Sequence, residues 1–349
     1  MPIAFVTGAT GLLGSNLVRQ LLEAGWTVRA LVRSPAKAKI QMANLAVEIV
    51  EGDMERVADF AESLVGADVL FHTAAYFRDS YKGGSHWTQL HRINVEGTRA
   101  LVQAAIAAKV GRMVHVSSTA TVLPPLDSAG CEDDRRSVAQ AADDYFRSKV
   151  MADLEIEQLL ESTPEFWATL VLPGFMQGPG DLGPTSAGQM LLDFTNRKLP
   201  AVLDIQMSFV DARDVAHALI RAAEDGKRGR RYLVAGSTMH LRDVYRTMEL
   251  VTKIAAPKRT MPRWLLLGYA ALSEVWARVT KRPVLLSWAG ARSILAEAKR
   301  SNFDSSRAVR ELGVEFRPLE ESLRDSLQYF REQGMLPAAT DSLHVHAAG

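Results

Sequence analysis

The chain opens with a short apolar strand pattern that runs directly into three evenly spaced glycines, and this feature constrains its fold more than any other. Residues 3–6 are apolar, and Gly8, Gly11 and Gly14 follow at intervals of three. The first glycine lets the chain turn sharply, the second lets backbone approach a pyrophosphate, and the third lets the next helix pack closely. The amphipathic pattern at 12–24 predicts that helix, whose free N–H groups would face an anion. We therefore predict a dinucleotide site rather than a purely structural turn, with contacts from Gly8, Thr10, Gly11, Leu12, Leu13 and Gly14.

The end of the second predicted strand, at residues 27–32, indicates which dinucleotide binds. An acidic residue there would bind the ribose 2′-hydroxyl of NAD. This sequence instead has Arg33 and Ser34, with Lys37 and Lys39 nearby. A guanidinium can bind a 2′-phosphate through two hydrogen bonds, and the serine hydroxyl can add a third. We therefore expect NADP(H) to be preferred, with NAD(H) as the alternative. If Arg33 is simply an exposed arginine at a strand end, it indicates no preference between the two cofactors.

Strand and helix patterns alternate along the first half of the chain. Strand patterns fall at 3–6, 27–32, 47–50, 69–72, 112–116 and 168–172, and helical patterns fall at 12–24, 93–108 and 142–160. Such alternation predicts an α/β fold of the Rossmann type, in which helices cover both faces of a doubly wound parallel sheet.

Prolines and glycines become dense after residue 172, and helical patterns then dominate. These patterns fall at 189–196, 214–223, 241–252 and 262–279, whereas 232–234 has the pattern of a strand that returns to the sheet. We predict a NAD(P)-binding Rossmann domain over 1–172 and a smaller, mainly helical substrate-binding cap over 173–335, interleaved with the sheet. The composition of 336–349 predicts a flexible tail.

Composition argues against several classes of function. The 349 residues carry a formal net charge of +1, which gives no electrostatic footprint for nucleic acid. Cys131 is the one cysteine, so no internal disulfide can form and a reducing, cytoplasmic location is expected. His86, His91 and His115 lack the spacing of metal ligands, so no metal site is expected.

The most apolar helical pattern lies at 262–279 and contains Arg263, Glu274 and Arg278. These charges interrupt it, and no run of about 18 apolar residues occurs elsewhere, so no spanning helix is predicted. We favour a packed helix or a helix that covers the substrate. The alternative is a helix that contacts a membrane surface.

A tyrosine and a lysine with helical spacing form the candidate reactive pair. Tyr145 and Lys149 are four residues apart and would lie on one helix face. A neighbouring ammonium favours the phenolate and lowers the pKa of the tyrosine.

The strand at 112–116 is followed by three hydroxyl residues, Ser117, Ser118 and Thr119, at an edge where parallel sheets bind ligands. We choose Ser118 as the partner; a shift of one residue would select Ser117 or Thr119 instead, and an ordinary helix cap is the structural alternative.

Taken together, these motifs resemble those of the extended short-chain dehydrogenases/reductases over nearly the whole chain. The resemblance is to the branch of dihydroflavonol reductases and 3β-hydroxysteroid dehydrogenases within the NAD-dependent epimerase/dehydratase group. It rests on the glycine turn, on Tyr145 and Lys149, and on the motif Phe-Val-Asp-Ala-Arg-Asp-Val-Ala at 209–216. Leu172 departs from the family, which usually has an arginine there, and this leaves the contacts near that loop in doubt.

The resemblance implies roles for further residues. The segments that line the cofactor in the family correspond here to Asp53 and Met54 near the adenine, to Thr73, Ala74 and Ala75, and to Pro173 and Gly174 beside the nicotinamide. Asn94 corresponds to the helix asparagine that orders a water relay to the lysine. Ser118, Tyr145 and Lys149 correspond to the catalytic set.

The resemblance also implies a reaction, the reduction of a ketone or aldehyde by hydride transfer from NADPH. Tyr145 would protonate the developing alkoxide, Ser118 would stabilise the oxyanion, and Lys149 would lower the tyrosine pKa and hold the ribose. A NAD-dependent sugar-nucleotide epimerase or dehydratase is the first alternative, and a non-catalytic nucleotide sensor is the second. Arg33 favours reduction, because an epimerase retains NAD in order to take and return the same hydride.

An aromatic segment after the strand at 69–72 suggests the substrate class. Tyr76, Phe77 and Trp87 are expected to form a wall of the substrate site, and ordinary loop packing is the alternative. Thr119 and Phe175 are further candidate contacts. With the apolar helix at 262–279, these side chains favour a hydrophobic carbonyl or the matching alcohol, of the dihydroflavonol, steroid or lipid type. Relatives often dimerise through the helices around the asparagine and the tyrosine, so a homodimer is expected.

Overall fold

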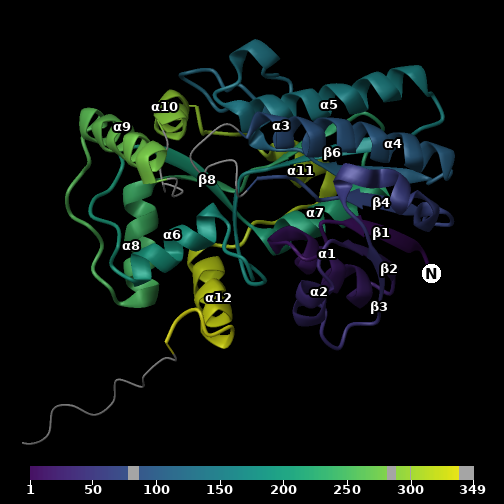
Figure 1. Cartoon of the computed structure of the whole chain (residues 1–349), viewed down its shortest axis with the longest axis horizontal. Helices are drawn as coiled ribbons and strands as arrows, with labels where there is room; N and C mark the ends of the chain where they lie inside the picture. The colour runs from purple at the N-terminus through teal and green to yellow at the C-terminus, as the bar shows by residue number, and fades with distance from the viewer. Residues whose placement is uncertain (78–85, 281–287, 299, 338–349) are drawn as a thin grey trace, which may run out of the picture.

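The computed structural model describes residues 1–77, 86–280, 288–298 and 300–337, and its central feature is a seven-stranded parallel sheet (Figure 1). Its strands are β1 (Ile3–Thr7), β2 (Thr27–Val32), β3 (Val47–Glu51), β4 (Val69–His72), β5 (Arg112–Val116), β6 (Ala168–Pro173) and β9 (Arg231–Val234). They lie in the order β3-β2-β1-β4-β5-β6-β9. The predicted Rossmann-type α/β fold is confirmed.

The strand order reverses between β1 and β4, and this reversal creates the place where a ligand can enter the sheet edge. The chain first builds outward through β2 and β3 and then returns to the other side of β1. At the carboxyl end of this pair, Thr7 lies opposite His72. Open parallel sheets bind ligands at such a switch point, because the helices that follow the two strands diverge there.

Helices cover both faces of the sheet. One face packs against α1 (Leu12–Glu23), α2 (Pro35–Gln41), α7 (Ala212–Asp225) and α11 (Ser306–Leu312). The other face packs against α4 (Gly97–Ala107), α5 (Asp144–Ser162) and the 3-10 turns η1 (Met54–Asp59) and η2 (Ala61–Leu64). Figure 1 shows α4 and α5 along one side of the sheet and α1 and α2 along the other. Ala168–Pro173 is buried on both faces and is therefore apolar apart from Thr169, whose hydroxyl donates to the Arg230 carbonyl at 2.8 Å.

The remaining elements form a smaller unit beside the carboxyl edge of the sheet. Its helices are α6 (Ser186–Thr195), α8 (Leu241–Thr252), α9 (Arg263–Thr280), α10 (Trp288–Glu297) and α12 (Leu319–Glu332). It also contains a second sheet, in the order β10 (Ser237–His240), β8 (Gln206–Asp211) and β7 (Phe175–Gln177). The sequence pattern predicted helices at the positions of α6, α8 and α9, but it missed α10, α12 and this sheet. Its strands have three to six residues, too few to show an alternation that stands out from loop composition.

Some predicted boundaries differ from the structure. The helix predicted at 93–108 is a short α3 (Trp87–Leu90), a π-helical stretch η4 (His91–Glu96) and α4 in direct succession. A π-turn has the composition of an α-helix, so periodicity could not separate them. Leu336, where the flexible tail was predicted to begin, is 5% exposed and packs into the core of the smaller unit. Residues 338–349 lie outside the described part, and the division at 172/173 stays a prediction.

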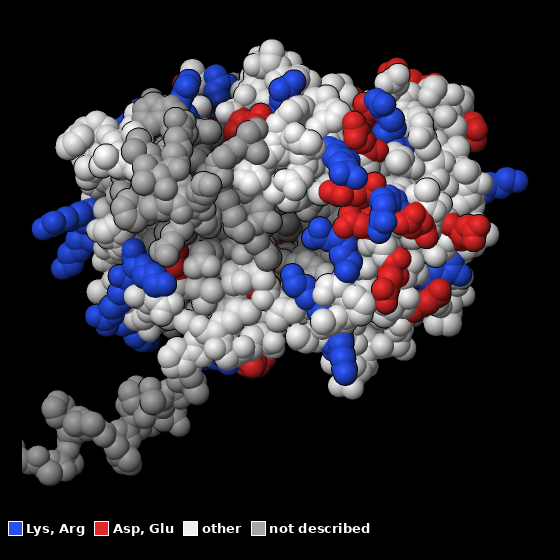
Figure 2. All heavy atoms as spheres, viewed as in Figure 1, with Lys and Arg blue, Asp and Glu red and all other residues white. Residues whose placement is uncertain are grey.

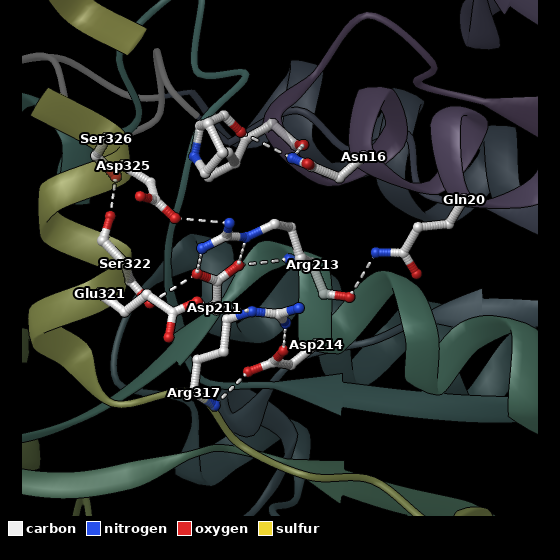
Figure 3. Close-up of polar contacts among 12 residues, drawn as sticks. Asn16, Gln20, Asp211, Arg213, Asp214, Arg317, Glu321, Ser322, Asp325 and Ser326 are labelled. Carbon is white, nitrogen blue, oxygen red and sulfur yellow. Dashed lines mark hydrogen bonds and ion pairs between the residues drawn. The ribbon is translucent and has the colours of Figure 1, made fainter. Parts of the chain in front are cut away.

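A buried carboxylate at the end of β8 holds the smaller unit to the sheet (Figure 3). Asp211 is 1% exposed and accepts two side-chain hydrogen bonds from Arg213, at 2.9 and 2.7 Å, and one from Ser322 of α12, at 2.6 Å. The Arg213 guanidinium also donates to Asp325 of α12 at 2.7 Å. Burial by itself would raise the pKa of Asp211, but the hydrogen bonds from Arg213 and Ser322 outweigh it and hold that pKa below its ordinary value.

We expect Asp211→Ala to lower the free energy of unfolding by about 3 kcal/mol, because it leaves the Arg213 guanidinium with Asp325 alone and the buried Ser322 hydroxyl without its acceptor. Urea denaturation monitored by circular dichroism measures this. The control is Asp225→Ala, whose carboxylate pairs with Arg221 at the surface and is 44% exposed. It should cost less than about 1 kcal/mol. Equal losses in the two variants would contradict a special role for Asp211.

Candidate functional site

The glycine turn leaves no room for a side chain at two of its three glycines. Gly8 has φ +68°, and a Cβ there would lie 2.7 Å from the backbone nitrogen of Ala74. A Cβ on Gly14 would lie 2.3 Å from the carbonyl oxygen of Gly8. Helix α1 therefore packs directly on the turn. Its N-cap is Gly11, and no side chain caps it. The turn thus has the uncapped helix start and bare backbone that a pyrophosphate needs, and the residues present fit the predicted dinucleotide.

A threonine and a histidine hold the neighbouring strand end against this turn. Thr7 Oγ1 lies 2.8 Å from His72 Nδ1 and accepts from the Ala74 N–H at 3.2 Å. The other ring nitrogen of His72 lies 3.0 Å from Thr98 Oγ1. Burial, with a smaller contribution from the Lys149 charge, lowers the pKa of His72 to about 3, so the ring is neutral at physiological pH. These contacts place residues 73–75 beside the glycine turn, as predicted for a segment that lines the cofactor.

The residues predicted to select the cofactor lie at the ends of β2 and β3. Arg33 is exposed, and no described residue forms an ion pair with it. The Ser34 hydroxyl accepts from the Lys37 N–H at 3.4 Å and so caps α2. Asp53 caps η1 by accepting from the Glu55 N–H at 3.0 Å, and Met54 is buried. Arg33 therefore keeps a free guanidinium, whereas Ser34 and Asp53 also have local structural partners.

The predicted reactive side chains converge at the carboxyl end of β5. Helix α5 is capped by Asp143 and carries Tyr145 in its first turn, and Ser118 forms a side-chain hydrogen bond with Tyr145. The Lys149 ammonium reaches across to the sheet and donates to the Val116 carbonyl at 2.8 Å. Among the three hydroxyl residues left open, a hydrogen bond from Ser118 affects the pKa of Tyr145, whereas Ser117 donates to Asp153 at 2.7 Å. The assignment of Ser118 as the catalytic serine stays a prediction.

Burial governs the proton affinities of this pair. It raises the pKa of Tyr145 above its ordinary value, and the hydrogen bond with Ser118 opposes this only in part. It lowers the pKa of Lys149 to about 8, although the Asp153 carboxylate raises it. Lys149 is not among the causes of the Tyr145 shift, and desolvation of the phenolate dominates, so the pKa of Tyr145 is raised where the sequence predicted that it would be lowered. The phenol stays protonated at neutral pH, which is the form that can donate a proton.

Asn94 ties two parts of the site together. It lies in the π-helical stretch, and its Oδ1 accepts from the Tyr76 N–H at 2.7 Å. Its Nδ2 donates to the Tyr76 carbonyl at 3.1 Å and to Ser148 Oγ at 3.0 Å. The side chain therefore fixes the segment after β4 against α5, between Tyr145 and Lys149. The water relay that the resemblance implies stays a prediction.

The predicted substrate wall is divided by the structure. The ring centroid of Phe77 lies 4.8 Å from that of Tyr145, in an edge-to-face contact. Phe77 therefore packs directly on the ring that carries the candidate reactive hydroxyl. Trp87 instead lies under the Arg147 guanidinium, 4.1 Å from its ring centroid. Phe175 packs on Phe209, with centroids 5.6 Å apart.

The other two candidate contacts lie close to the predicted site. Tyr76 has its hydroxyl 3.1 Å from His86 Nδ1, and Thr119 opens a 3-10 turn directly after Ser118. Phe77 is thus the aromatic candidate in direct contact with the reactive pair.

Sequence reasoning missed a buried charged cluster behind Lys149. Asp153 lies one turn further along α5, 3.7 Å from His115 Nε2 and 3.6 Å from the Arg231 guanidinium on β9. All three are at most 5% exposed. Burial, the Lys149 charge and His72 lower the pKa of His115 far below its ordinary value, so this ring is neutral. The spacing of four residues from Lys149 could have suggested Asp153, but nothing local connects it with Arg231.

Other features of the described residues bear less directly on this site. A cavity of about 250 Å³ lies at the start of α8, lined by residues that include Leu203, His240 and Arg242, and none of the predicted site residues borders it. Within the described ranges, no three His, Cys, Asp or Glu side chains are grouped as metal ligands. No described helix is long and apolar enough to cross a membrane.

Comparison with known proteins identifies the family. The model of the NAD dependent epimerase/dehydratase family matches residues 4–235. The chain is 32% identical over 340 residues to a putative dihydroflavonol 4-reductase from Synechocystis sp., covering 95% of each chain. It is 34% identical over 335 residues to sterol demethylase protein B from Methylococcus capsulatus, covering 95% of this chain and 99% of that one.

A solved structure agrees with these matches. The crystal structure of gox2253 superposes with a TM-score of 0.82 at 31% identity, covering 96% of this chain and 99% of that one. The chain belongs to the NAD dependent epimerase/dehydratase family and is an NAD(P)-dependent oxidoreductase.

The Asp153 cluster generates a prediction about pH dependence. The charged or titratable side chains around Lys149 are Tyr145, Asp153 and the neutral His72 and His115. Because Asp153 raises the pKa of Lys149, Asp153→Asn should lower that pKa further, so the ammonium is lost at lower pH. The alkaline limb of the kcat/KM profile should therefore move toward acid. A pH–rate profile measures this shift.

Two further variants separate this electrostatic effect from a loss of structure. Asp153→Glu should restore the position of the alkaline limb, since it restores the charge. Glu161→Gln, an exposed carboxylate further along the same helix, should leave the limb in place. An unshifted profile in Asp153→Asn, with lower activity at every pH, would mean that Asp153 only supports the fold.

Proposed function

We propose that this protein reduces a ketone or aldehyde with NADP(H), using Ser118, Tyr145 and Lys149 as its catalytic residues. One observation carries the proposal: Tyr145 is hydrogen-bonded to Ser118 beside the buried ammonium of Lys149, at the sheet edge that also holds the glycine turn. The two halves of the site come from opposite sides of the strand reversal, so a bound nicotinamide and a carbonyl would meet between them.

Each residue has a distinct part in this mechanism. The bound nicotinamide supplies the hydride. Tyr145 holds a proton on its hydroxyl at neutral pH and donates it to the carbonyl oxygen as negative charge develops there. Ser118 can donate a hydrogen bond to the same oxygen and orient it. Lys149 places a positive charge close by, which favours the phenolate left after proton transfer. We further propose that Asn94 acts by holding the segment after β4 in place.

The preference for NADP(H) is proposed from Arg33. Its guanidinium is exposed at the end of β2 and has no ion-pair partner among the described residues, and no acid stands where NAD would need one. A 2′-phosphate would give it two charge-assisted hydrogen bonds. Thr73, Ala74, Ala75, Pro173 and Gly174 are proposed to line the rest of the cofactor.

The proposed substrate is an apolar, ring-containing carbonyl compound. Phe77 lies edge-on to Tyr145, so an apolar ring of the substrate would have an aromatic surface to contact next to the reacting carbonyl. The names of the relatives, a dihydroflavonol reductase and a sterol demethylase protein, are consistent with that class. The homodimer expected through the helices that carry Asn94 and Tyr145 is part of the proposal, and sedimentation velocity measures it.

Tyr145→Phe tests the catalytic assignment. It removes the proton donor and keeps the ring that packs on Phe77, so kcat should fall at least ~100-fold while NADPH binding is unchanged. NADPH consumption at 340 nm with a panel of flavonoid, steroid and aliphatic ketones measures the rate. Tyr245→Phe, in the core of the smaller unit, is the matched control and should keep its activity. Full turnover in Tyr145→Phe would rule out the assignment.

Arg33→Glu tests the cofactor preference. It should raise the KM for NADPH about tenfold or more, because a charge-assisted hydrogen-bond pair is replaced by repulsion, and it should affect NADH far less. Arg310→Glu, an exposed arginine on α11, serves as the control. A protein that purifies with stoichiometric NAD and is unaffected by Arg33→Glu would favour a sugar-nucleotide epimerase or dehydratase instead.

A further inference from the structure

Helix α9 exposes large apolar side chains on one face although its opposite face is packed. Trp264 is 72% exposed and Leu272 is 73% exposed, and Leu265 beside them is 45% exposed. Trp264 and Leu272 are eight residues apart, with Gly268 between them, so the two side chains form one stripe along the same side of the helix. On the other side, Leu266 and Ala270 are buried against Ala291 of α10. The helix is therefore anchored to the protein while its stripe of apolar residues faces solvent, which is costly unless something covers it.

The surroundings of this stripe are basic. Between residues 250 and 273 the sequence contains Lys253, Lys258, Arg259 and Arg263 and no acidic residue. All four cations are exposed, and none forms an ion pair with a described residue. Figure 2 shows Lys and Arg gathered where Figure 1 places α8, the helix next to α9 in that view. Glu249 and Glu274 stand at the two ends of this stretch, so cations outnumber acids four to two over residues 249–274. An apolar stripe with this excess of positive charge matches an anionic, partly apolar surface.

The same helix is connected to the reactive end of α5. Helix α10, which packs on α9, donates a hydrogen bond from Ser293 Oγ to Asp143 Oδ2 at 2.9 Å. Asp143 is the N-cap of α5 and precedes Tyr145 by two residues. Whatever α9 binds is thus two helix contacts away from Tyr145. The α9 surface lies on the unit that was expected to receive the substrate.

We propose that α9 docks the protein on an anionic lipid bilayer surface, with Trp264 and Leu272 in the interface and the four cations against the headgroups. Tryptophan is favoured at the level of the headgroups, and each cation near an anionic membrane surface adds attraction. The helix is amphipathic and lies along the surface of the protein, so it would lie in the plane of the membrane without crossing it. A second copy of this chain fits less well, because a symmetric contact would bring together two sets of four cations.

Flotation with two kinds of vesicle tests the proposal and needs no substrate, so its result does not depend on the proposed reductase activity. The protein should bind vesicles of phosphatidylcholine that contain ~30 mol% phosphatidylglycerol, a composition with a strongly anionic surface. It should bind pure phosphatidylcholine at least about tenfold more weakly. High salt should release it, because the attraction to the headgroups is screened.

Two variants separate the apolar from the electrostatic contribution. Trp264→Ser with Leu272→Ser should lower binding at least about tenfold, since two large apolar side chains leave the interface. Lys258→Glu with Arg259→Glu should lower it by a similar factor only on the anionic vesicles. The matched control is Leu126→Ser, an exposed leucine (60%) outside α9, which should bind like the parent. All three variants change exposed residues, and circular dichroism checks that they fold.

Three outcomes would overturn the proposal. The first is no binding to the anionic vesicles. The second is equal binding by the parent and by the Trp264 and Leu272 variant. The third is a dimer in sedimentation velocity that Trp264→Ser dissociates, because the stripe would then be covered by a second copy.

Discussion

The close packing of α1 on the strand ends is the constraint on which the rest of the structure depends. A Cβ on Gly14 would lie 2.3 Å from the Gly8 carbonyl, and a Cβ on Gly8 would lie 2.7 Å from the Ala74 nitrogen. These two contacts bring the uncapped start of a helix, the end of β1 and the segment after β4 to one point at the strand reversal. Thr7 and His72 then fasten the two strand ends to each other. The proposed dinucleotide site is therefore built from backbone contacts, with few side chains involved.

The other half of the site depends on buried charge. Lys149 is 4% exposed, and taking its ammonium out of water is unfavourable by itself. The Val116 carbonyl and the nearby Asp153 carboxylate offset part of that cost, and Arg231 in turn pairs with Asp153. The two histidines of the cluster avoid further charge by remaining neutral. The pKa of Lys149 is thus set by helix α5 together with strands β5 and β9.

The smaller unit is joined to this frame at several well-defined places. Asp211 at the end of β8 binds Arg213 of α7 and Ser322 of α12, so one carboxylate connects the small sheet, a helix of the Rossmann layer and the C-terminal helix. Asp143 receives the hydrogen bond from α10. Both carboxylates act at helix N-termini, where the free N–H groups and the helix dipole favour negative charge. These joints fix the elements of the smaller unit against the ends of the strands and the start of α5.

The sequence by itself determined the features that depend on neighbours along the chain. The alternation of strand and helix patterns predicted the parallel sheet. The spacing of Gly8, Gly11 and Gly14 predicted the turn. The spacing of Tyr145 and Lys149 predicted that both lie on one helix face. Each of these is decided by a backbone period or by the size of one residue. The small sheet β10-β8-β7 was not found in this way, because its short strands are stable only through pairing with one another.

Only the tertiary structure decided which buried charges meet. Asp153 and Arg231 come from α5 and β9 and are 78 residues apart in sequence (231 minus 153). The pKa of Tyr145 also follows from the water that surrounding elements exclude, which reversed the direction expected from Lys149 alone. The burial of a side chain depends on many segments that are distant in sequence, so a local sequence pattern cannot predict it. The choice of Ser118 over Ser117 has the same origin, because it depends on which hydroxyl faces Tyr145 and which faces Asp153 once the strand and the helix are packed.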